Sequence, residues 1–125
     1  MNQPDARMLE PTVLAELKAS VDGDRAFVVE LIEAYLADGV AHVDAIAAAL
    51  SDGDAEAMVR PAHTLKSSSA TVGAMHLSST ARELEMAARS GSLVPAGEAA
   101  AGRIPVEWDA TTVALRSWIA ADDAP

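Results

Sequence analysis

Apolar residues recur at alternating steps of four and three along the stretch from Val28 to Leu50. The positions are Val28, Ile32, Leu36, Gly39, Val43, Ile46 and Leu50. This spacing places them all on one face of an α-helix, so it predicts a single helix of about 27 residues that begins after Asp24 as the N-cap. Gly39 lies on this apolar face, where a missing side chain permits close packing, and we expect the helix to continue through it.

The composition favours helices for the rest of the chain. More than one residue in five is alanine, and only 3% of residues are aromatic. Alanine is the strongest helix former and buries little area, so we expect an all-α fold with closely packed helices and a thin core. The length of 125 residues is typical of one domain, predicted over 1-125. The absence of cysteine excludes disulfides and cysteine-ligated metal sites.

Turn and capping residues divide the remaining chain into further helices. Pro11 opens a short first helix that ends near Asp22-Gly23, and a third helix runs from the Asp54 cap to Gly73. A fourth helix ends at Gly91, residues 92–102 are expected to form a loop, and a fifth helix is expected to begin near Pro105. We therefore predict an antiparallel four-helix bundle over about 11-121, covered by the short first helix, with frayed termini.

The charge and the hydropathy of the chain argue against several classes of function. Nine basic and nineteen acidic side chains give a formal charge of -10, which disfavours binding to nucleic acid or to an anionic membrane surface. No apolar run approaches the roughly 18 residues of a membrane span, and residues 1–5 lack the pattern of a secretory signal. We expect a soluble cytoplasmic protein.

His63 lies on the solvent side of the expected third helix. The apolar stripe of that helix is Met58, Ala62, Leu65, Ser69 and Val72. At about 100° per residue, His63 points roughly 150° away from the stripe. Arg60, Ser67 and Thr71 share its outer face, Ala70 lies beside it, and Lys66 lies on the flank. The histidine therefore has cationic and small neighbours.

An exposed imidazole is largely neutral at pH 7 and can act as a nucleophile, for which phosphorus is the plausible electrophile. Lys66, three residues further along the helix, could reach the oxygens of a phosphoryl group on His63. Small side chains at Ser67 and Ala70 leave room for a partner above the ring. The same pattern also fits an ordinary solvated helix face, and periodicity alone leaves both interpretations open.

The residue identities around His63 resemble a known family. Residues 62–74, AHTLKSSSATVGA, are similar to the His-x-Leu-Lys-Gly-Ser-x-x-x-x-Gly signature of histidine-containing phosphotransfer (HPt) domains. The resemblance extends to Phe27, Leu31, Tyr35-Leu36, the turn at 52–54, Leu77, Leu84-Glu85, Ala88-Arg89 and Gly91. It implies a four-helix bundle whose exposed histidine, here His63, carries a phosphoryl group between receiver-domain aspartates in a two-component phosphorelay. The lysine of the signature is Lys66.

Two residues depart from the family pattern. Ser67 stands where the family usually has glycine, which adds a hydroxyl close to the path of an approaching partner. Pro61 lies inside the third helix, where it removes the hydrogen bond to the Ala57 carbonyl, so we expect a kink two residues before His63.

The other candidate residues have simpler interpretations. His42 and His76 are expected to be surface or capping residues, and no histidine pair has the helical spacing of a metal site. Trp108 and Trp118 are expected to be packing residues. The glutamates, together with Asp38, are expected to form a solvated face.

The resemblance implies partners as well as a site. We expect response-regulator receiver domains and a hybrid histidine kinase, with Mg²⁺ only in the receiver and no cofactor on this chain, which we expect to be a monomer. Arg60, Thr64, Ser67, Ala70 and Thr71 are the expected partner-binding residues. No nucleotide-binding glycine motif is present, so the chain is expected to lack autokinase activity. The alternative is a helical adaptor or inhibitor that binds a receiver or kinase without being phosphorylated.

Overall fold

The computed structural model describes residues 8–121, and these form helices without any strand. The helices are α2 (Pro11–Ser20), α3 (Arg25–Asp52), α4 (Ala55–Thr71), α5 (Met75–Arg89) and α6 (Ala96–Ala120). The prediction of an all-α four-helix bundle with an additional short N-terminal helix is confirmed. The termini that were expected to fray, residues 1–7 and 122–125, lie outside the described residues.

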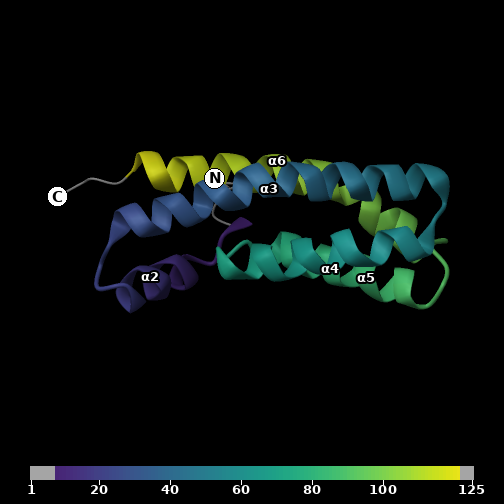
Figure 1. Ribbon diagram of the computed structural model, residues 1–125, viewed down its shortest axis with the longest axis horizontal. Coiled ribbons are helices and arrows are strands. Elements are labelled where there is room, and N and C mark those ends of the chain that lie inside the picture. The colour runs from purple at the N-terminus through teal and green to yellow at the C-terminus, as the bar shows by residue number, and fades with distance from the viewer. Residues whose placement is uncertain (1–7, 122–125) are drawn as a thin grey trace, which may run out of the picture.

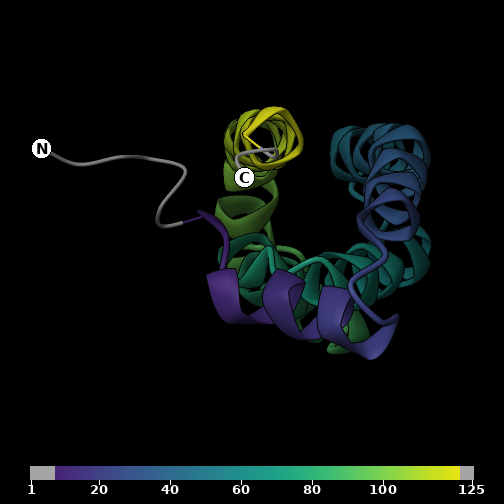
Figure 2. The same ribbon diagram turned by 90° about the vertical axis from the view of Figure 1, so that its left-hand side faces the viewer.

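The four longer helices pack in chain order around a common core. Helices α3 and α6 run along one side of the molecule, and the shorter α4 and α5 run along the other (Figure 1). Seen from the end, α2 lies across the ends of α4 and α5 (Figure 2). It is held there by the buried side chain of Leu14 and by a hydrogen bond from the Glu10 amide to the Gly73 carbonyl at 2.7 Å. The short helix therefore covers one end of the core, as its position in the sequence predicts.

Capping residues fix where the helices begin and end. The Asp24 carboxylate accepts a hydrogen bond from the Phe27 amide, and the Asp54 carboxylate accepts one from the Ala57 amide, so both predicted N-caps are confirmed. Gly53 and Gly73 have positive φ angles of 63° and 82°, a backbone conformation that glycine adopts without strain. These turns are short, so α4 is fixed closely between α3 and α5.

The long helix α3 continues through Gly39, and α6 approaches it closely at that point. A Cβ atom on Gly39 would lie 2.1 Å from Cη2 of Trp108, so only glycine allows this approach. The Trp108 ring also contacts Tyr35, with the ring centroids 5.4 Å apart. Both tryptophans pack as expected, since Trp108 is buried and Trp118 is half-buried beneath the Arg25 guanidinium.

The predicted apolar stripe of α4 faces the core. Met58, Ala62, Leu65 and Ser69 are all fully buried, which confirms the orientation of this helix. The Ser69 hydroxyl bonds the Tyr35 hydroxyl at 2.7 Å and thus links α4 to α3. Burial raises the pKa of Tyr35 to about 12, so this buried hydroxyl stays protonated at neutral pH. Pro61 is buried inside the helix two residues before His63, and the kink expected there stays a prediction.

One helix boundary was wrongly predicted. Residues 92–102 were expected to form a loop and the last helix to begin near Pro105, but α6 begins at Ala96 and Pro105 lies inside it. Alanines at 96 and 99–101 favour a helix, and Ala100 and Ala101 are buried in the core. Gly97 packs closely on Leu93, where a Cβ atom would lie 3.0 Å from a leucine methyl. The packing of these alanines and of Gly97 thus stabilises the helix by more than the loss of one backbone hydrogen bond at Pro105 destabilises it.

No helix within residues 8–121 is both long enough and apolar enough to cross a membrane.

Candidate functional site

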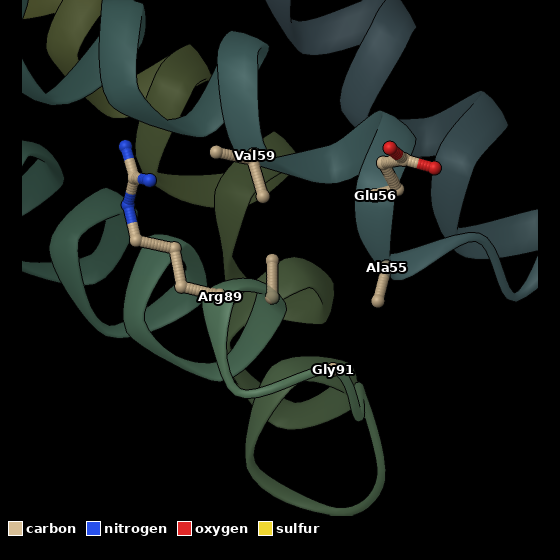
Figure 3. A pocket seen from close by; sticks show the side chains of 6 residues that line it. Ala55, Glu56, Val59, Arg89 and Gly91 are labelled. Atoms are coloured by element: carbon tan, nitrogen blue, oxygen red, sulfur yellow. The ribbon is translucent and has the colours of Figure 1, made fainter.

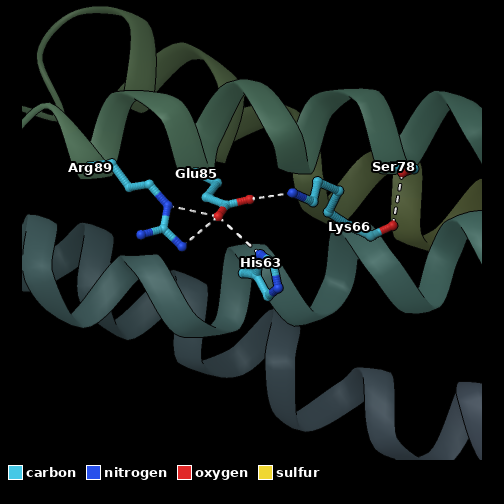
Figure 4. A network of polar contacts seen from close by, with 5 residues as sticks. All are labelled: His63, Lys66, Ser78, Glu85 and Arg89. Atoms are coloured by element: carbon cyan, nitrogen blue, oxygen red, sulfur yellow. Dashed lines mark hydrogen bonds and ion pairs between the residues drawn. The ribbon is translucent and has the colours of Figure 1, made fainter.

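Helix α4 presents His63 to solvent on the side opposite its buried stripe. The imidazole is 52% exposed, although Ala62 before it and Leu65 after it are fully buried. The predicted outward orientation of His63 is therefore correct. Its ring lies on the surface of α4 where helix α5 passes beside it (Figure 4).

The carboxylate of Glu85, on α5, is the centre of a polar network beside this ring. Its Oε2 atom lies 3.0 Å from Nδ1 of His63 and 2.8 Å from both Nε and Nη2 of Arg89. Its Oε1 atom lies 2.8 Å from Nζ of Lys66 (Figure 4). Only 7% of the Glu85 side chain is exposed, so these contacts are shielded from water. One buried carboxylate thus joins the histidine to two cations from two helices.

The charge of Glu85 determines which nitrogen of His63 is free. Hydrogen bonds from Lys66, and then from Arg89 and His63, lower the pKa of Glu85 from 4.5 to about 2, although burial opposes the change. The carboxylate is therefore ionised at neutral pH and accepts a hydrogen bond from the Nδ1–H group of His63. This leaves the lone pair on Nε2, where the ring is open to a partner. The arrangement suits a nucleophile that reacts through Nε2.

The backbone at Lys66 is fixed from α5. The Ser78 hydroxyl donates a hydrogen bond to the Lys66 carbonyl at 2.8 Å, and the ammonium group of Lys66 binds Glu85. Lys66 was expected at the edge of the solvent face, and its side chain is indeed 30% exposed. The sequence did not predict that a carboxylate from the next helix holds its ammonium group.

The structure brings the other predicted site residues to the same surface of α4. Arg60, Ser67 and Thr71 are exposed, and Thr64 and Ala70 are half-buried. A surface hollow beside the histidine is lined by Val59, Arg60, His63, Thr64 and Arg89.

A second hollow continues along the α4–α5 groove toward the start of α4 (Figure 3). Its lining consists of Ala55, Glu56, Val59, Ala88, Arg89 and Gly91. The two hollows share Val59 and Arg89, so the groove is open from His63 to the α5 C-terminus.

The remaining histidines lie away from this network. His42 is half-buried on α3. His76, in the first turn of α5, places Nε2 3.0 Å from Oε2 of Glu107 on α6. No group of three or more potential metal ligands occurs in the part of the chain that the structure describes.

Glu85 and Glu107 correct the expectation that the glutamates form a solvated face. Both are buried, with 5% and 8% of the residue exposed. The sequence places Glu85 among the residues of the family resemblance but indicates no role for it, because a single carboxylate carries no spacing signal of its own. The available signal was position, since Glu85 directly follows Leu84, which is buried on α5, and precedes Arg89 by one helical turn.

Comparisons with known proteins agree on one family. The profile of the Hpt domain family matches residues 30–121. The crystal structure of histidine-containing phosphotransfer protein B (HptB) from Pseudomonas aeruginosa PAO1 superimposes with a TM-score of 0.78 at 28% sequence identity, covering 88% of this chain and 92% of that one. The search of curated proteins gives no match. Together with the buried stripe and exposed histidine of α4, these matches show that the chain belongs to the Hpt domain family and is a phosphohistidine carrier of a phosphorelay.

Proposed function

We propose that His63 is the residue that carries the phosphoryl group, and that it exchanges this group with the aspartates of receiver domains. The observation that supports this most directly is the contact of Nδ1 with the buried Glu85 carboxylate, which leaves Nε2 as the nucleophile on an exposed ring. Neither His42 nor His76 combines an exposed ring with a free Nε2 atom, since His42 is half-buried and His76 uses Nε2 to bind Glu107.

The transfer step follows from this geometry. The lone pair on Nε2 of His63 attacks the phosphorus of an aspartyl phosphate, and the bond from phosphorus to the aspartate oxygen breaks. The aspartate leaves as a carboxylate, while the Nδ1 proton stays in its hydrogen bond to Glu85. The ring gains positive charge in this step, and the adjacent anionic carboxylate offsets it. The reverse step returns the phosphoryl group to a receiver aspartate.

The neighbouring residues have supporting roles in this proposal. Lys66 stabilises the negative charge of the phosphoryl group from the flank of α4, where its ammonium group is held beside the histidine by Glu85. Arg60, Thr64, Ser67, Ala70 and Thr71 form the surface on which the receiver docks. A local cationic surface matters for docking because the acidic pocket of a receiver would otherwise be repelled by a chain with a net charge of -10.

We propose that a partner protein supplies the phosphoryl group. The sequence contains no nucleotide-binding glycine motif, which supports the absence of autokinase activity. Hpt domains interact with receiver domains and histidine kinases in phosphorelays. We propose a hybrid histidine kinase as the source of the phosphoryl group for this chain. Mg²⁺ belongs to the receiver, and no cofactor is assigned to this chain. We expect a monomer that acts in the cytoplasm and binds neither nucleic acid nor membranes, consistent with its acidic charge.

Phosphoryl transfer from a labelled receiver domain tests the proposal. We expect the wild-type chain to take up the label in an acid-labile, alkali-stable form, because the P–N bond of phosphohistidine has these stabilities. The His63→Gln variant should take up none. Labelling of this variant at the wild-type rate would show that another residue carries the group. Stable binding to the receiver without any labelling of the wild-type chain would instead support the adaptor function.

A further inference from the structure

The hollow beside His63 contains hydrogen-bond donors that have no partner among the residues that the structure describes. It is lined by Val59, Arg60, His63, Thr64 and Arg89, so two guanidinium groups and one hydroxyl lie around the nucleophile. Neither the Arg60 guanidinium nor the Thr64 hydroxyl makes a hydrogen bond or an ion pair with any residue between 8 and 121. In a chain with nineteen acidic residues, an arginine that binds no carboxylate is available for an anion from outside.

The other cations near His63 are already committed to a carboxylate. The Lys66 ammonium binds Oε1 of Glu85 at 2.8 Å, and Lys66 does not line the hollow. Arg89 directs Nε and Nη2 at Glu85 but is 58% exposed, and its Nη1 atom points away from that carboxylate (Figure 4). The Lys66 ammonium would share its N–H donors between Glu85 and a phosphoryl group, whereas the Arg60 guanidinium has no competing partner within residues 8–121.

We infer that Arg60, together with the Thr64 hydroxyl and Nη1 of Arg89, forms the subsite that binds the oxygens of the phosphoryl group during its transfer to His63. This inference rests on the proposed phosphorylation of His63. Arginine suits the role because its planar fork binds two oxygens of a phosphoryl group at once, whereas an ammonium group acts as a point charge. Lys66 then has the smaller share in stabilising the phosphoryl group, and it also holds the Glu85 carboxylate against Nδ1 of His63.

A small phosphodonor separates this subsite from partner docking. Phosphoramidate can phosphorylate a histidine without any receiver domain. Nε2 of His63 attacks the phosphorus of phosphoramidate, whose amino nitrogen is protonated, and the P–N bond breaks so that ammonia leaves with the electron pair of that bond. The Nδ1 proton remains on the ring and bonded to Glu85. The rate of this reaction reports on groups of the chain that contact the phosphoryl group itself.

The experiment compares initial phosphorylation rates of the wild type with those of Arg60→Ala, Arg60→Lys, Lys66→Ala and Arg82→Ala. Arg82 is the matched control, because it is also exposed and has no ion pair within the described residues, but it does not line the hollow. We expect Arg60→Ala to be slower by about 10- to 100-fold and Arg60→Lys to be intermediate. Arg82→Ala should stay within about twofold of the wild type, and Lys66→Ala should lose less than Arg60→Ala.

Equal rates for Arg60→Ala and Arg82→Ala would overturn the subsite and leave the role of His63 intact. A larger loss for Lys66→Ala than for Arg60→Ala would also overturn it, since the lysine would then be the main phosphoryl ligand. Labelling of His63→Gln at the wild-type rate would instead contradict the proposed function. Circular dichroism checks that each variant is folded, and Arg60→Gln replaces Arg60→Ala in the comparison if the alanine variant loses helicity.

Discussion

Two histidine–glutamate pairs lie within residues 8–121, and they differ in the ring nitrogen that binds the carboxylate. In the first, Nδ1 of His63 lies 3.0 Å from Glu85, and in the second, Nε2 of His76 lies 3.0 Å from Glu107. Both rings are about equally exposed, at 52% and 58%, and both carboxylates are largely buried. Exposure and an adjacent carboxylate therefore do not distinguish a phosphorylation site from a structural contact.

The two pairs differ in which ring nitrogen does not bind the carboxylate. His63 keeps Nε2, the nitrogen farther from the backbone, whereas His76 keeps Nδ1, which is crowded by its own main chain. The surroundings differ as well, because Glu85 also binds Lys66 and Arg89, while Arg103 lies 3.7 Å from Glu107. If His63 carries the phosphoryl group as proposed, the buried carboxylate promotes transfer by binding Nδ1 and leaving Nε2 for the partner.

Replacing the two histidines should give the largest difference between the pairs. We expect His63→Gln to lose all labelling from a phosphorylated receiver, and His76→Gln to keep the wild-type rate within about twofold. Labelled receiver and gel autoradiography measure both. Comparable losses in the two variants would mean that the difference in ring nitrogen has no bearing on transfer.

The surface next to each ring should also differ in importance. Ser67 lies one helical turn beyond His63 on the same exposed face, where a long side chain would obstruct the approach of a receiver aspartate. We expect Ser67→Gln to block transfer and Ser67→Gly to preserve it, as measured by initial transfer rates. Ser79→Gln, an exposed change on α5 three residues from His76, is the control and should have no effect. A folded Ser67→Gln protein with unchanged transfer would contradict docking over this face.

Replacing the carboxylates should have a smaller effect than removing the nucleophile. We expect Glu85→Ala to slow transfer by about 10- to 100-fold, because His63 loses both its fixed tautomer and the charge that offsets the phosphorylated ring. Glu107→Ala should leave the transfer rate unchanged. Single-turnover transfer from a phosphorylated receiver gives both values. The opposite ranking would show that Glu85 only links the two helices.

The smallest effect should be on stability in acid. Because the pKa of Glu85 falls from 4.5 to about 2 in the folded protein, its ionised form stabilises the fold above pH 4.5, and this contribution is lost as the pH falls toward 2. The wild type should therefore have a higher free energy of unfolding than Glu85→Gln. This difference should be largest at neutral pH and should shrink below pH 4.5. Urea unfolding across this range measures the difference. A constant gap would show that the ion contacts of Glu85 do not lower its pKa.

Sequence reasoning reached the helices and the histidine but not the carboxylates. The apolar spacing in α4 determines which side faces the core, and His63 must then face outward. The same spacing places Gly39 on the apolar face of α3, and the close approach of Trp108 explains why a glycine occupies this position. Glu85 and Glu107 were not predicted because their roles depend on how α5 sits against α4 and α6, which periodicity within one helix does not encode. The start of α6 does not follow from the sequence, because a proline such as Pro105 favours a helix start, whereas packing of the preceding alanines continues the helix through it.

Identifying the ring nitrogen of His63 that is phosphorylated tests the proposed role of Glu85 most directly. NMR of imidazole ¹⁵N resonances, recorded before and after phosphorylation, reports the tautomer of each histidine and the atom that carries phosphorus. We predict that His63 carries its proton on Nδ1 before the reaction and the phosphoryl group on Nε2 after it, with His76 unmodified. A phosphoryl group on Nδ1 of His63, or on His76, would contradict this prediction.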